Sequence, residues 1–345
     1  MASKNRMLVI LALLAAAVAV GWYRSEVYSV PDANPRPQLI LMTGGSSPYW
    51  QLIANGAQAA AKTDGADLEV MMLEQDEDVE GQTHLLSKLE ASNVDGIAVS
   101  PLDAVQQTRF INELATDTVV VTIDSDAPLS SRLCYVGASN YAAGSLCARL
   151  VKEAKPDGGK VAVLVANLTK NNVLERKQAL EEGLASGASA GENSDAVYEV
   201  VAVLADEGDL GRCSEQLTQT VEQHSDLACV VGVNSYHAEQ IMAVLDKQNA
   251  IGKVKIVAFD TEDATLEGVE QGHIYATVAQ DPYHYGYEAV RWLAHNSQRT
   301  GNQLPLMGTR STVHISTRAL RGDDVPEFRK QYRELLGEAA ESPNQ

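Results

Sequence analysis

Aromatic and basic residues are scarce in this chain of 345 residues. Aromatics make up only 5%, and Lys+Arg number 27 against 46 for Asp+Glu, which gives a formal net charge of −19 at pH 7. That much negative charge opposes binding to a polyanion, because such binding depends on neutralising phosphates with Lys and Arg. No nucleic-acid partner is therefore expected.

The motifs of common catalytic and metal sites are also missing. The four Cys form no Cys-x-x-Cys pair and no His/Cys cluster with the spacing of a zinc site. There is no phosphate loop, and no serine elbow lies between a predicted strand and a predicted helix. We therefore expect neither a metal nor a cofactor.

The one long apolar run lies at the N-terminus. Lys4 and Arg6 precede an apolar stretch from 7 to 20, which is the pattern of a secretory signal. The aromatic pair Trp22-Tyr23 extends the run, so a retained membrane anchor is the alternative. In both cases residues 1–36 are a signal or anchor plus linker, and the rest is expected to be periplasmic or otherwise extracytoplasmic.

Such a compartment permits disulfides. We expect the pairs that are local in sequence, Cys134 with Cys147 and Cys213 with Cys229. Four buried free thiols are the alternative, because sequence alone cannot choose a connectivity.

Short apolar runs alternate with longer amphipathic ones along most of the chain. Runs of about five residues, each followed by a helical pattern of ten to fifteen, are typical of βαβ units and a parallel sheet. The first set begins at 38–43, and the rhythm restarts at 160–165. Two short strands are expected at 304–307 and 312–315, with a surface helix after Gly322. The fold class is therefore α/β with two Rossmann-like lobes.

Polar side chains stand where the predicted strands end. In open α/β sheets, ligands collect outside the carboxyl ends of the strands. Carboxylates accept hydrogen bonds, a guanidinium donates several, amides do both, and an aromatic face suits the C–H face of a sugar ring. Together they describe a polyol site. The candidates are Ser47, Tyr49, Trp50, Asp124, Arg176, Asn234, His237, Asp260 and Gln280. The alternatives are that Tyr49 and Trp50 belong to the core, that Arg176 makes a surface salt bridge, and that Asp260 caps the next helix while Gln280 is a solvated strand end.

Six segments in order carry a family likeness. They are SSPYW at 46–50, VDGIAVSPLDA at 94–104, VTIDSDA at 121–127, LERKQAL at 174–180, IVAFD at 256–260 and ATVAQDPYHYGYEAV at 276–290. With them the chain resembles the periplasmic sugar-binding proteins of the ribose/galactose type (type I periplasmic binding proteins), the substrate receptors of ABC importers. The resemblance covers about 37–318.

The resemblance implies two lobes joined by three crossings, with a sugar between them. The first lobe would be 37–138 plus 281–311, the second 139–280 plus 312–330, with 331–345 as a polar tail. The family's sugar contacts carry over onto Ser47, Tyr49, Trp50, Asp124, Arg176, Asp260 and Gln280. The segment VNSYHAEQ fits in two registers, which put either Asn234 or His237 at the family's Asn position.

The function implied is a monomeric extracytoplasmic monosaccharide receptor that closes over its ligand and delivers it to an ABC permease in the membrane. A sugar-sensing subunit for a membrane receptor or kinase would use the same site. A carbohydrate-active enzyme is a remote alternative, since glycosidases use two carboxylates. Arg176 beside Asp124 and Asp260 is expected to hold both ionised, which does not suit a general acid, so no enzymatic activity is expected.

Overall fold

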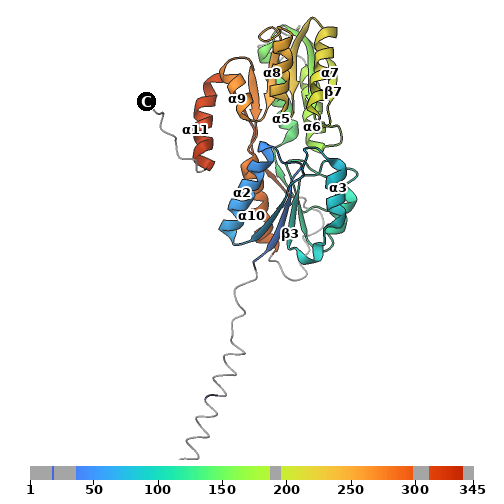
Figure 1. Cartoon of the computed structure of the whole chain (residues 1–345), viewed down its shortest axis with the longest axis vertical. Coiled ribbons are helices and arrows are strands. Elements are labelled where there is room, and N and C mark those ends of the chain that lie inside the picture. The colour runs from blue at the N-terminus through green and yellow to red at the C-terminus, as the bar shows by residue number, and fades with distance from the viewer. Residues whose placement is uncertain (1–17, 19–35, 187–195, 298–310, 337–345) are drawn as a thin grey trace, which may run out of the picture. The chain divides into compact units, whose positions relative to one another are not determined.

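The computed structural model describes residue 18 and residues 36–186, 196–297 and 311–336 (Figure 1). Residues 37–345 group as one compact unit, separate from residues 1–36, and the description below concerns that unit. Within the described residues no helix is long and apolar enough to span a membrane. The N-terminal apolar run at 7–20, apart from Val18, and the strand expected at 304–307 lie outside the described residues.

The first lobe is built on a parallel sheet of strand order β11-β5-β4-β3-β1-β2. Alternate residues of its strands enter two apolar cores, as the period of two in a strand requires. Helices α2 and α10 cover one face, and α3 and α4 cover the other (Figure 1). The elements are β1 (Gln38–Met42), α2 (Pro48–Asp64), β2 (Asp67–Met71), α3 (Val79–Lys88), η1 (Ala91–Asn93), β3 (Gly96–Val99), α4 (Thr108–Leu114), β4 (Val119–Ile123), β5 (Cys134–Gly137), α10 (Pro282–Ser297) and β11 (Ser311–His314).

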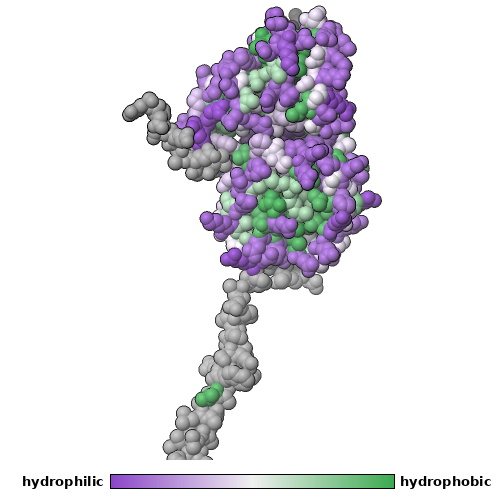
Figure 2. Space-filling model, in the orientation of Figure 1, coloured by the Kyte–Doolittle hydropathy of each residue, from purple (hydrophilic) through white to green (hydrophobic). Residues whose placement is uncertain are grey.

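The second lobe repeats this plan with strand order β12-β10-β9-β8-β6-β7, in which only β12 is antiparallel to its neighbour. Helices α5 and α6 cover one face, and α7, α8, α9 and α11 the other. On the face shown in Figure 2 this lobe is mostly hydrophilic, whereas apolar residues gather over the first lobe. The elements are α5 (Asn140–Ala154), β6 (Gly158–Val165), α6 (Asn171–Ala185), β7 (Val197–Ala205), α7 (Leu210–Gln223), β8 (Leu227–Gly232), α8 (His237–Lys247), β9 (Lys255–Phe259), α9 (Asp263–Glu270), β10 (Ala276–Ala279), β12 (Arg318–Leu320), η2 (Gly322–Asp324) and α11 (Val325–Leu336).

The chain passes between the lobes three times, after β5, after β10 and after β11. The third crossing lies later than the sequence predicted. We expected the second lobe to resume at residue 312, but Ser311–His314 pair in parallel with β5 of the first sheet. The boundary expected at 331 for the start of the polar tail is also too early. Helix α11 continues to Leu336, and its buried Phe328 packs into the core of the second lobe.

The expected disulfides are wrong: all four cysteines are free and buried. Cys134 belongs to the core of the first lobe, whereas Cys147 packs in a core of the second. Cys213 and Cys229 face opposite sides of the second sheet. Neither pair can bridge, because a disulfide needs facing Cβ atoms a few ångströms apart. Burial raises the pKa of the Cys134 thiol to about 11, which keeps it protonated at neutral pH.

Helices α2 and α10 cross in close contact at two glycines. A Cβ on Gly56 would collide with the carbonyl oxygen of Tyr283, and a Cβ on Gly286 with that of Ile53. The two contacts are reciprocal, so both helices can approach only without a side chain there. This crossing sets the position of the first turn of α2, which carries Tyr49 and Trp50.

We expect Gly286→Ala to lower the free energy of unfolding by about 1–3 kcal/mol, the usual cost of overpacking. Intrinsic helix propensity alone would instead stabilise this variant by about 1 kcal/mol, so the sign is diagnostic. Urea denaturation measures it. Gly322→Ala is the control, because the nearest atom to its Cβ would be 3.5 Å away. A stability gain in Gly286→Ala would contradict the close contact.

Candidate functional site

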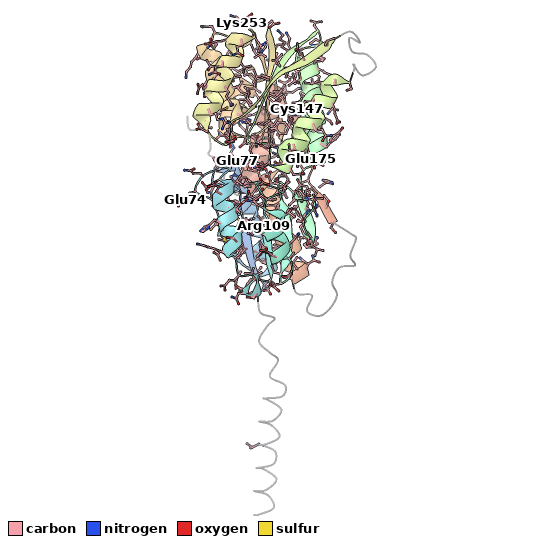
Figure 3. All side chains as sticks on the ribbon, turned by 90° about the vertical axis from the view of Figure 1, so that its right-hand side faces the viewer. Glu74, Glu77, Arg109, Cys147, Glu175 and Lys253 are labelled. Atoms are coloured by element: carbon pink, nitrogen blue, oxygen red, sulfur yellow. The ribbon has the colours of Figure 1, made fainter. Side chains whose placement is uncertain are left out.

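A small polar cavity of about 30 Å³ lies where the two lobes meet. The first-lobe residues that line it come from the segments after β2 and β4 and from the first turn of α2. The second-lobe residues come from the segments after β6, β8, β9 and β10. The labelled Glu77 marks this level in Figure 3. The lining residues are Tyr49, Trp50, Asp76, Glu77, Asp124, Lys170, Asn172, Arg176, Asn234, Ser235, Tyr236, Asp260 and Gln280. Of the predicted site residues, all but Ser47 and His237 are brought together here.

Arg176 of α6 is a buried cation of the site, with only 2% of its surface exposed. Its Nε donates to Oδ1 of Asn140 at 2.9 Å, and its Nη2 donates to Oε1 of Gln280 at 2.7 Å. Its Nη1 donates to the backbone oxygen of Val233 at 2.9 Å. Burial lowers the pKa of Arg176, but Asp260 and Asp124 outweigh that effect and raise it above its ordinary value. The guanidinium therefore stays charged and joins the ends of α5, β8 and β10.

Asp124 follows β4 and collects hydrogen bonds from both lobes. Its Oδ1 accepts from the Tyr49 hydroxyl at 2.7 Å, and its Oδ2 accepts from the Ser100 hydroxyl at 3.1 Å. From the second lobe, Nδ2 of Asn172 donates to Oδ2 at 3.2 Å. Burial, followed by the charge of Asp124, raises the pKa of Tyr49 well above its ordinary value. Tyr49 thus remains a neutral donor.

Asp260 is the counterpart of Asp124 in the second lobe. Each is the first residue after its strand, each has a left-handed backbone (φ 57° for Asp124 and 67° for Asp260), and each donates its backbone N–H to the strand alongside. Such strained positions cluster at functional sites. Burial raises the pKa of Asp260 to about 7, although Arg176 and a 2.8 Å hydrogen bond from Nε2 of Gln280 both oppose the rise.

This pKa corrects one step of the sequence argument. Arg176 was expected to hold both carboxylates ionised, but the cost of burying a charge outweighs its attraction at Asp260. A carboxyl group that titrates near neutrality could act as a general acid, so the presence of Arg176 does not exclude catalysis at Asp260.

Sequence reasoning missed the charged pair that connects the lobes. Glu77 of the first lobe accepts from Nζ of Lys170 at 2.7 Å and from Nδ2 of Asn167 at 2.7 Å. The pair is nearly inaccessible, with side-chain exposures of 3% for Lys170 and 5% for Glu77. Nζ of Lys170 also lies 5.4 Å from the Trp50 ring centroid, within reach of a cation–π attraction. We call Glu77, Asn167 and Lys170 the latch.

Ser47 and His237 lie beside the cavity without lining it. The backbone N–H of Ser47 donates to Oδ1 of Asp76 at 3.1 Å, and its hydroxyl has no partner among the described residues. His237 is fully buried. Its Nδ1 accepts from the backbone N–H of Asn234 at 3.2 Å, so its Nε2 carries the proton toward Asp206 at 2.8 Å. Of the two registers of VNSYHAEQ, the structure places Asn234 at the cavity and His237 behind it.

Asp206, Cys213 and His237 bring potential metal ligands within 4.8 Å of one another. Their polar atoms already have partners, because Asp206 accepts from His237 and, at 2.5 Å, from the Tyr236 hydroxyl. Burial raises the pKa of the Cys213 thiol, which disfavours the thiolate that a metal needs. The geometry fits a structural support for the 234–236 turn.

Comparisons with known proteins identify the family of the chain. A family model described as a periplasmic binding protein domain matches residues 39–301. The chain belongs to this family. The D-allose-binding periplasmic protein of Escherichia coli K12 is 22% identical over 270 residues, which cover 76% of this chain and 84% of that protein. A D-ribose/D-allose-binding protein of Pseudomonas aeruginosa is 18% identical over 266 residues, 74% of this chain and 80% of that one.

Among solved structures, a glucose-galactose binding protein from Geobacillus stearothermophilus aligns with a TM-score of 0.76 and 29% identity. The alignment covers 85% of this chain and all of that one (100%). The family and the two-lobed α/β fold expected from the six segments are therefore confirmed. Relatives in this family are binding proteins, and its name places it outside the cytoplasm.

The raised pKa of Asp260 makes stability depend on pH. Its carboxyl ionises near pH 4 when unfolded and near pH 7 when folded. The stability contributed by the bound proton is complete below about pH 4 and is lost as pH rises through about 7. Asp260→Asn cannot ionise and tolerates a positive φ. We therefore expect the wild-type protein to lose stability relative to Asp260→Asn by roughly 1.4 kcal/mol per pH unit between pH 5 and 7.

Urea titrations at pH 5, 6, 7 and 8 measure the difference. Asp117→Asn, at an exposed carboxylate that does not line the cavity, is the control and should show no such trend. A wild-type-to-variant difference that stays constant across this range would contradict the burial of an ionisable Asp260.

Proposed function

We propose that the protein is an extracytoplasmic sugar receptor of an ABC importer, with a monosaccharide ring held in the cavity between the lobes. The observation that carries the proposal is the pairing of Asp124 and Asp260 around Arg176, with Tyr49 and Trp50 as an aromatic wall. Hydroxyl groups of a sugar can donate to the carboxylates and accept from the guanidinium. Charged partners make these bonds stronger than neutral ones.

The relatives support the sugar class. Their names describe binders of allose, ribose, glucose and galactose. The carboxylates of the cavity accept hydrogen bonds from donors fixed in the protein, such as Tyr49 and Gln280. Binding alone needs no more than exchange of those donors for sugar hydroxyls.

Entry of the ligand requires the lobes to part. A cavity of about 30 Å³ holds water but not a sugar ring. The three crossings provide a hinge, and rotation about such crossings is a common route to closure. In the structure Asn172 donates to Asp124 and the latch residue Lys170 donates to Glu77. A sugar ring needs more room than about 30 Å³, so on closure over a ligand its hydroxyls would replace Asn172 at Asp124, and the latch would re-form around it. The permease would then recognise the closed form, and an N-terminal export signal would deliver the receptor to it. A sensory role would use the same cavity with a different membrane partner.

A thermal-shift screen of residues 34–345 against pentoses, hexoses, sugar alcohols and amino acids tests the ligand class. A ligand that binds only the folded state raises the melting temperature, so we expect a rise with at least one sugar. Calorimetry then measures the affinity of that sugar for Asp124→Ala. Loss of two charge-assisted hydrogen bonds, at about 1.5–3 kcal/mol each, predicts at least 100-fold weaker binding.

Asp117→Ala is the matched control, because this carboxylate is exposed and outside the cavity. Circular dichroism should show both variants folded. Near-normal sugar affinity in Asp124→Ala would show that the sugar does not bind at Asp124. A rise in melting temperature with amino acids but with no sugar would overturn the sugar assignment.

A further inference from the structure

The cavity between the lobes has more acidic than basic side chains in its wall. Four carboxyl groups line it, against one ammonium and one guanidinium group. The ammonium of Lys170 is neutralised by Glu77 in the latch. The guanidinium of Arg176 is shared, because Asp124 and Asp260 both act on it. With every carboxyl group ionised, four negative charges face two positive ones, so the wall carries an excess of two negative charges.

Two of these carboxyl groups keep an oxygen without a hydrogen bond. Asp260 has only 5% of its surface exposed. Its Oδ1 accepts from Nε2 of Gln280 at 2.8 Å, and its Oδ2 accepts from none of the described residues. The fourth carboxyl group, Asp76, accepts the backbone N–H groups of Ser46 and Ser47 at Oδ1 alone, and it forms no ion pair within the described residues. Neither Oδ2 atom is sealed from water, so the bonding capacity left in the wall includes two anionic acceptors.

The positively charged nitrogens of the cavity, in contrast, already have acceptors. Nε, Nη1 and Nη2 of Arg176 each donate to an oxygen of the protein. Nζ of Lys170 donates to Glu77, and the side chains of this pair are nearly inaccessible. An anionic ligand would therefore meet carboxylates that lack a counter-charge, and like charges at short range disfavour each other's ionised forms. A ligand with a positive charge would instead balance the excess.

The titration of Asp260 agrees with this unbalanced charge. Burial raises its pKa to about 7, and the charges of Asp124 and Glu262 add to the rise. Arg176 and the hydrogen bond from Gln280 oppose the rise without cancelling it. At neutral pH a proton therefore neutralises this carboxyl group part of the time. A ligand cation in contact with Oδ2 would supply the same compensation and would keep the carboxylate ionised.

We propose that the preferred ligand is an amino sugar, a monosaccharide in which one hydroxyl is replaced by an ammonium group that donates to Oδ2 of Asp260. An ammonium group has three donors and no acceptor, which matches oxygens that only accept. A hydrogen bond between two charged partners is also stronger than one between neutral groups. The inference rests on the proposed sugar-receptor function and deepens it by naming the ligand class.

Calorimetry at pH 6.5 tests the ligand class, because an amine with the pKa of about 8 that is typical of an α-amino group is protonated there. The probes are glucose, galactose and mannose, each compared with its 2-amino and 6-amino derivatives, with the N-acetylated forms of those amines and with its uronic acid. We expect at least one amine to bind about tenfold or more tightly than its parent sugar. Its N-acetylated form, which keeps the nitrogen without the charge, should lose that gain, and the uronic acids should bind less tightly than their parents.

The position of the ammonium group is tested by Asp260→Asn, which removes the charge and tolerates the positive φ. This variant should bind every sugar more weakly, and the ratio of amine affinity to parent affinity should fall to about one. Asp117→Asn is the control and should keep the ratio, because it removes an exposed carboxylate that does not line the cavity. If Asp260→Asn fails to fold, Asp76→Asn carries this test, since Asp76 holds the other free carboxylate oxygen in the wall.

Amines that bind no more tightly than their parents in all three series would overturn the amino-sugar assignment alone. So would amines and N-acetylated amines of equal affinity, or an affinity ratio that the substitution of the aspartate leaves unchanged. Failure of every sugar to bind, with or without an amine, would overturn the receptor function as well.

Discussion

The burial of one guanidinium constrains most of the site. Arg176 can remain charged at 2% exposure only because oxygens of Asn140, Val233 and Gln280 accept its hydrogen bonds and two carboxylates face it. An unpaired buried charge would cost several kcal/mol. Helices α5 and α6 must also approach closely, since a Cβ at Gly144 would collide with the backbone oxygen of Arg176. The close packing of α5 against α6 and the polar partners in the cavity are therefore both needed to bury Arg176 as a cation.

The two carboxylates show how a repeated fold yields a site between its copies. Asp124 and Asp260 each leave a strand in the left-handed conformation and hold the neighbouring strand with the backbone N–H. Their environments then differ. Asp124 accepts from Tyr49, Ser100 and Asn172, whereas Asp260 has Gln280 and a pKa raised to about 7. A ligand with hydroxyls on both sides can therefore meet a carboxylate from each lobe.

The sequence indicated those features that depend on local pattern. Alternation of short apolar and longer amphipathic runs predicted the two sheets, and the first polar residue after each strand predicted Asp124 and Asp260. Contacts between lobes were not predictable in this way, because Glu77, Asn167 and Lys170 meet only once both lobes face each other. The acidic stretch at 74–80 contains Glu77 but gives no sign of its partner. The sequence left the choice between Asn234 and His237 open for a related reason, since the support that His237 gives to Asn234 depends on Asp206, thirty-one positions from His237. The cysteine pairs failed because nearness along the chain does not say which face of a sheet a residue occupies.

The central claim is that a ligand in the cavity holds the two lobes together through the latch and Asp124. Small-angle X-ray scattering with and without a saturating sugar tests it most directly, on the wild-type protein, on Glu77→Gln and on Glu181→Gln. The control removes an ion pair that lies within α6 and joins no lobes. We predict that the sugar lowers the radius of gyration of all three proteins, and that Glu77→Gln needs more sugar to reach the compact state. A radius of gyration unchanged at full saturation, or a Glu77→Gln titration identical to that of Glu181→Gln, would contradict the account.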